Sequence, residues 1–65
     1  MGITARKDFN LFLCHARGSL HELETQLLIA HHLHYLTEEE ATELAGVCRE
    51  IGRMLHGLIT FATAA

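Results

Sequence analysis

Apolar residues recur every three or four positions along most of this 65-residue chain, which is the period of an amphipathic helix. Between residues 9 and 30 they form one continuous stripe with heptad-like spacing, and a second stripe follows between residues 41 and 58. These stripes predict a helix at about residues 4–34, a turn at about 35–37 and a helix at about 38–61.

The start of the second helix is marked by the segment YLTEEEA, residues 35–41. Thr37 followed by Glu40 fits a capping box, in which two side chains satisfy two otherwise unpaired backbone N–H groups. Glu38, Glu39 and Glu40 would occupy the first turn, where the helix dipole favours negative charge. Thr4 is the corresponding candidate for the N-cap of the first helix.

Two long helices joined by a short turn predict an antiparallel αα-hairpin, so we expect an all-α fold and a single domain spanning residues 1–65. Gly18 lies inside the first helix, where it costs about 1 kcal/mol relative to alanine. We expect Gly18 and Ser19 to allow another helix to approach closely. The expected seam between helices consists of Phe9, Leu13, Ala16, Leu20, Leu23 and Leu27 from the first helix and Leu44, Cys48, Ile51, Leu55 and Leu58 from the second.

The composition predicts self-association. Hydrophobic residues make up 49% of the chain, yet a domain this small buries only about 60% of the surface that its unfolded form exposes. Leu11, Leu28, Ile29 and Ile59 are expected to lie away from the seam and in water unless further helices cover them. We therefore expect a homo-oligomer.

The charge pattern argues against several classes of protein. The formal net charge is −3, with only five Lys and Arg residues, unlike the clustered basic surface of a nucleic-acid binder. No apolar run approaches the roughly 20 residues that span a membrane, and charged residues near the N-terminus interrupt any signal-peptide pattern. We expect no membrane association and a cytoplasmic location.

The most conspicuous polar cluster is formed by His31, His32 and His34 at the predicted end of the first helix. Histidines there interact favourably with the helix dipole, and this structural role is the favoured interpretation. A metal-binding pair and a pH sensor remain as alternatives, although zinc sites usually take three or four protein ligands. Cys14 and Cys48 are expected to be reduced, buried thiols.

No arrangement of residues predicts catalysis. Cys14 and His15 are adjacent, and adjacent helical residues do not face each other. No glycine loop for phosphate and no third group to orient a base is present. We therefore expect no enzymatic activity, no cofactor, no metal and no small-molecule substrate.

The segments ARGSLHELETQLLIAHHLHYLTEEE, residues 16–40, and RMLHGLI, residues 53–59, resemble the four-helix bundle proteins of the 23S rRNA intervening-sequence type. This resemblance implies an up-and-down bundle that forms ring-like homo-oligomers. The chain corresponds to the second half of that bundle, so we expect oligomerisation to complete it. Where the family tends to have glycine, this chain has His34, which must adopt the left-handed conformation or extend the helix.

The resemblance also bears on function. Some relatives are encoded inside ribosomal RNA genes, and a similar fold assists a reverse transcriptase in diversity-generating retroelements through a basic surface. Our first hypothesis is a non-catalytic, self-associating structural or interaction module, and the alternative is an RNA- or ribonucleoprotein-associated protein. An ordinary solvated face is a simpler explanation for the candidate interaction residues, which are Arg17, Glu22, Glu24, Gln26, Arg49 and Arg53.

Overall fold

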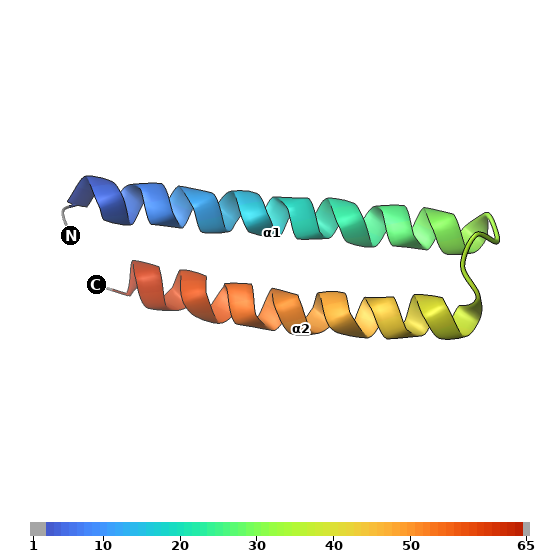
Figure 1. The fold of residues 1–65 in the computed structure, drawn as a ribbon. Coiled ribbons are helices and arrows are strands. Elements are labelled where there is room, and N and C mark those ends of the chain that lie inside the picture. The colour runs from blue at the N-terminus through green and yellow to red at the C-terminus, as the bar shows by residue number, and fades with distance from the viewer. Residues whose placement is uncertain (1–2, 65) are drawn as a thin grey trace.

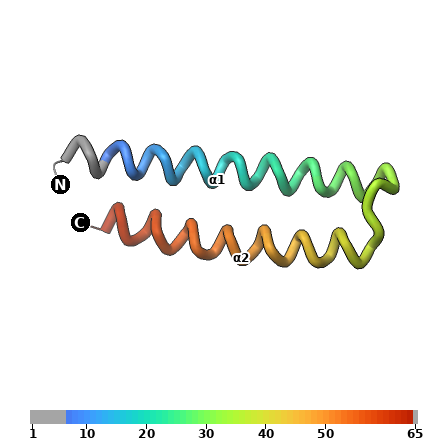
Figure 2. The backbone as a smooth tube through the Cα atoms, in the orientation of Figure 1, coloured from blue at the N-terminus to red at the C-terminus, as the bar shows by residue number. Residues whose placement is uncertain are grey.

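The computed structural model describes residues 3–64, with side chains from residue 7, as two helices packed side by side (Figure 1). Helix α1 spans Ile3–His32 and helix α2 spans Glu38–Thr63. They run antiparallel and form a narrow rod with extents of 48 × 15 × 12 Å (Figure 2). The predicted all-α helical hairpin is confirmed; its completion into a four-helix bundle remains a prediction.

Helix α1 ends because the backbone turns into the left-handed region at His34, whose φ is 66°. The His34 N–H donates to the carbonyl of His31 at 3.0 Å, and the Tyr35 N–H donates to that of Ala30 at 2.9 Å. These two bonds form a Schellman motif, which satisfies carbonyls that the helix leaves unpaired. Of the two outcomes expected at His34, the chain adopts the left-handed one, and α1 ends two residues before the predicted boundary.

Helix α2 begins with the predicted capping box, which is confirmed. The Glu40 N–H donates to the Thr37 hydroxyl oxygen at 3.1 Å, and the Thr37 N–H donates to the Glu40 carboxylate at 2.9 Å. At the other end α2 continues to Thr63, two residues beyond the prediction, and the Thr63 hydroxyl donates to the Ile59 carbonyl at 2.8 Å. The turn is therefore closed by hydrogen bonds at both ends, by the Schellman motif at the end of α1 and by the capping box at the start of α2.

The hydrophobic core is a single row of side chains between the helices. Leu13, Leu20, Cys48 and Ala62 are its buried members, while Ala16, Leu27 and Leu55 are half-buried. On α2 the row follows Cys48, Gly52, Leu55, Ile59 and Ala62. A Cβ placed on Gly52 would lie 3.5 Å from a methyl group of Leu20, which locates the close contact between the helices.

The residues of the predicted bundle seam divide between the contact with α1 and an exposed side of α2, and their place in a bundle stays a prediction. Leu44, Ile51 and Leu58 are 37–45% exposed, and Gly52 and Ile59 lie nearer to α1. The physical reason is that small residues allow two helices to approach, whereas the larger ones lie beside that contact. Phe9 and Leu23 are likewise 41% and 45% exposed at the edge of the row.

Two smaller expectations, for Cys14 and Thr4, are corrected. The expectation that another helix approaches Gly18 and Ser19 stays a prediction, since no described atom lies within 4 Å of a Cβ placed on Gly18 and the close approach within the chain is at Gly52. Cys14 is exposed, and only Cys48 is a buried thiol. Thr4 lies inside α1, which is already helical at Ile3, so it does not hold the N-cap position.

Candidate functional site

Most of the exposed large hydrophobic side chains in the described residues lie on one face of the hairpin, formed by one flank of each helix. Its side chains are 37–79% exposed, although all are large and hydrophobic. Because water contact is unfavourable for this much apolar surface, the face is a candidate for interaction. We call it the apolar face, and it comprises Phe9, Phe12 and Leu23 of α1 and Leu44, Val47, Ile51, Met54, Leu58 and Phe61 of α2.

Helical geometry places these residues on the same side of the hairpin. Leu44, Ile51 and Leu58 each come four positions before a core residue of α2, and Phe9, Ala16 and Leu23 stand in the same relation to the core row of α1. A residue four positions before a core residue points about 40° away from it around the helix axis, and the sense of this rotation is the same in both helices. Helix α2 runs opposite to α1, and its core side points in the opposite direction, toward α1. These two reversals cancel, so the two flanks lie on the same face of the hairpin.

The other flank carries charge and defines a polar face of Arg17, His21, Glu24, Arg49, Arg53 and His56, all of them exposed. His21 Nδ1 lies 3.7 Å from Glu24 Oε1, which is an ion pair when His21 is protonated. Within the described part of the chain this is the only ion pair, so the three arginines there have no carboxylate partner. Their charge is available to an external anion.

The six predicted interaction residues do not form one cluster. Arg17, Glu24, Arg49 and Arg53 share the polar face. Glu22 comes two positions after the core residue Leu20, which puts it on the side of α1 turned away from α2. Gln26 lies at the outer edge of the apolar face. Five residues of the apolar face already belong to the seam expected from the sequence: Phe9, Leu23, Leu44, Ile51 and Leu58. The other four, Phe12, Val47, Met54 and Phe61, were not among the predicted site residues.

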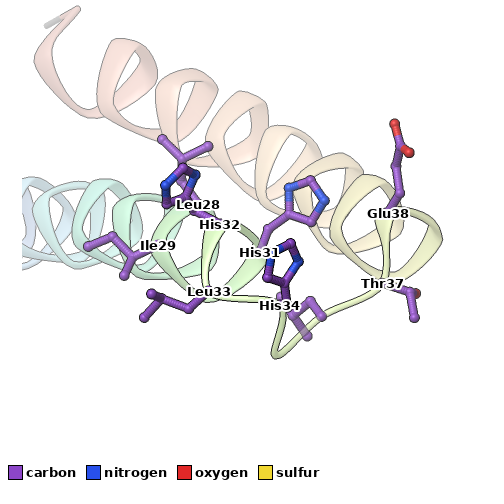
Figure 3. Close-up of a pocket in the computed structure, with 9 residues that line it drawn as sticks. Leu28, Ile29, His31, His32, Leu33, His34, Thr37 and Glu38 are labelled. Carbon is purple, nitrogen blue, oxygen red and sulfur yellow. The ribbon is translucent and has the colours of Figure 1, made fainter.

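The histidine cluster surrounds an open hollow at the turn (Figure 3). His31 is half-buried in the last turn of α1, whereas His32 and His34 are exposed. Most other lining side chains are apolar, among them Leu28 and Leu33. Across residues 7–64, no three His, Cys, Asp or Glu side chains are arranged to hold a metal ion.

The turn also lowers the pKa of one acidic side chain. The pKa of Glu40 is lowered from its usual 4.5 because its carboxylate accepts a hydrogen bond from the Thr37 backbone N–H, with a second contribution from the Thr37 side chain. Such bonds favour the ionised form. The group therefore stabilises the start of α2.

Comparison with known families identifies the group of proteins to which this hairpin belongs. The sequence matches the 23S rRNA-intervening sequence protein family over residues 1–57. The chain belongs to this family. The match includes α1, the turn and α2 as far as Gly57, so the resemblance expected from the sequence is confirmed.

No curated protein and no solved structure matches this 23S rRNA-intervening sequence protein. The family takes its name from an intervening sequence of 23S rRNA. Neither helix in the described residues is long and apolar enough to cross a membrane.

Proposed function

We propose that this chain is a non-catalytic interaction module that self-associates through its apolar face. The observation that supports this proposal is the contrast between the interior and the surface. Among residues 7–64, four side chains are buried, and nine large hydrophobic ones lie exposed on one face. A protein with so small an interior gains more from covering that face than from any rearrangement within one chain.

The size of the apolar face is sufficient for a stable interface. At the exposures observed, the nine side chains present on the order of 900 Å² of apolar surface, given roughly 200 Å² for a large side chain. Stable interfaces bury about 800 Å² per partner. The face therefore has the area that a specific dimer requires.

Light scattering on the purified chain, with circular dichroism on the same sample, tests this proposal. We expect a helical oligomer, and we expect Met54→Lys to shift it toward monomer. Leu11→Lys is the matched control, because Leu11 is 56% exposed and Met54 59%, but Leu11 lies on the outer side of α1. A helical monomer for the unmodified chain, or equal effects of the two variants, contradicts the proposal.

RNA association is the second candidate, and the observation that favours it is the set of arginines on the polar face. Arg17, Arg49 and Arg53 are exposed there without carboxylate partners in the described residues, and the family is named for a ribosomal RNA insertion. Cationic contacts to phosphate make binding salt-dependent. Self-association through the opposite face would bring several copies of this set into one particle.

A binding titration against ribosomal RNA fragments at several salt concentrations tests the second candidate. We expect affinity to fall steeply with salt and replacement of all three arginines by glutamine to reduce the slope. Replacing Thr25, His15 and Glu22 by glutamine is a control on the outer side of α1. Unchanged affinity in the arginine variant contradicts RNA association and leaves self-association intact.

A further inference from the structure

We infer that the occupant of the apolar face is a second copy of this chain, placed so that α1 of each copy packs on α2 of the other and both turns lie at the same end. This inference rests on the proposed self-association and specifies its geometry. Two arrangements with twofold symmetry can bring two such faces together. They differ in which helices meet and in where the turns lie.

In the first arrangement the twofold axis runs parallel to the helices. The second copy is then rotated about the long direction of the rod, and every residue keeps its level along that direction. Helix α1 of one copy covers α2 of the other, and the turns coincide at one end. In the second arrangement the axis crosses the helices at right angles, so that α1 meets α1, α2 meets α2, and the turns lie at opposite ends.

Side-chain size distinguishes the two arrangements. The flank of α2 is large throughout, with Val47, Met54 and Leu58 at its centre. The corresponding flank of α1 has small side chains at its centre, where Ala16 and Ser19 lie. Packing α2 on α2 would set large side chains against large ones, while α1 on α1 would leave a gap. Packing α1 on α2 sets large side chains against small ones at the centre of both contacts, which is how well-packed layers interdigitate.

The level of each residue supports the first arrangement further. Leu20 lies beside Gly52 in the hairpin, so Ser19 of one copy would lie at the level of Met54 of the other. Ala16 would lie near Leu58 by the same rule, and Leu23 near Val47 and Ile51. Each small residue of α1 thus meets a large residue of α2 without any sliding of the two copies.

Distance measurement between labelled turns tests the inference. Tyr35 is 79% exposed in the turn, so Tyr35→Cys can carry a spin label once Cys14→Ser removes the exposed thiol; Cys48 is 3% exposed. The chain without Tyr35→Cys controls for labelling at Cys48. We expect a label separation below about 25 Å, since neighbouring helix axes lie about 8–10 Å apart. Turns at opposite ends would instead give about 45 Å, the length of a 30-residue helix.

The outcomes separate the inference from the proposal beneath it. A dimer with the long separation, or with both separations together, overturns the shared-end geometry and leaves self-association standing. A monomer by light scattering overturns both. A fluorescence donor on Tyr35→Cys and an acceptor on Lys7→Cys in mixed dimers should show weak transfer, and strong transfer contradicts the inference.

A pair of charge substitutions provides an independent test. Ser19→Glu and Met54→Lys should each weaken dimerisation at least about tenfold, because each places a charge in the interface. Combined in one chain, they should restore affinity to within about threefold of the original, since opposite charges then meet across the copies. Thr25→Glu is the control for Ser19→Glu. A double variant weaker than either single one overturns the inference, because α1 on α1 and α2 on α2 would bring like charges together.

Discussion

At the residue scale, the turn depends on one residue in an unfavourable backbone conformation. His34 has a φ of 66°, a region that costs an L-residue roughly 1–2 kcal/mol and glycine almost nothing. The sequence identified this position and the two outcomes open to it. It could not choose between them, because that choice depends on the two hydrogen bonds from His34 and Tyr35 to the last turn of α1.

His34→Gly should raise the free energy of unfolding by about 1 kcal/mol, because glycine adopts the left-handed conformation without a Cβ clash. Urea denaturation at a fixed chain concentration measures this change. His32→Gly is the matched control and should lower stability by a similar amount, since His32 is helical. An unchanged or lower stability for His34→Gly contradicts this account of the turn.

The capping box makes part of the stability depend on pH. Folding lowers the pKa of Glu40, so the folded state favours its ionised form, and this contribution is fully present above the unfolded pKa of 4.5. It is lost as the pH falls through the lower pKa of the folded state. Thermal unfolding between pH 6 and about pH 3 should show a smaller decline for Glu40→Gln, which keeps a side-chain acceptor but does not titrate. Glu43→Gln, on the next turn of α2, should retain the decline of the original chain, and equal declines in both variants contradict the assignment.

At the scale of elements, the spacing of Thr37 and Glu40 predicted the capping box, the short turn predicted antiparallel helices, and sequence periodicity predicted the helices themselves. It could not show which stripe of α2 faces α1, because two apolar stripes run side by side and share Cys48 and Leu55. Hydrophobicity favours the stripe with Ile51, whereas close packing selects the stripe with Gly52. The apolar face is the stripe that this packing leaves uncovered, so it became visible only once α1 and α2 were placed together.

Glycine substitutions distinguish the contact side of a helix from its free side. Gly18→Ala and Gly52→Ala should each stabilise the hairpin by about 1 kcal/mol, because a Cβ meets nothing within 4 Å at Gly18 and makes an ordinary 3.5 Å contact at Gly52. Gly52→Leu should destabilise by about 1–3 kcal/mol through overpacking against Leu20, while Gly18→Leu should not. Chemical denaturation of the four variants measures these differences, and similar effects of the two leucines contradict the described contact.

At the scale of the whole molecule, the hairpin is more extended than a compact protein of its size. Its accessible surface is 5364 Å², against about 4,200 Å² for a compact protein of the same mass. Its radius of gyration is 15.0 Å, and a compact chain of this length has about 11 Å. Neither value could be obtained from the sequence, because composition gives the amount of apolar residue and not the shape in which it is arranged.

Self-association should make thermal stability depend on concentration. If the folded form is an oligomer, mass action raises its midpoint of unfolding as the chain concentration rises. Circular dichroism melts over a hundredfold range of concentration should show this increase for the original chain and for Leu11→Lys. The dependence should be largely lost in Met54→Lys, and a midpoint independent of concentration in the original chain contradicts an oligomeric folded state.

The single turn also orders the way in which the hairpin opens and closes. Every contact between α1 and α2 encloses this turn, so the pairs nearest to it close the shortest loops and those nearest to Ala62 the longest. Loop-closure entropy grows with the length enclosed. Pairing of the two helices should therefore begin at the turn and proceed toward the chain ends. Amide hydrogen exchange along α2 should be slowest near Ala41 and become gradually faster toward Thr63.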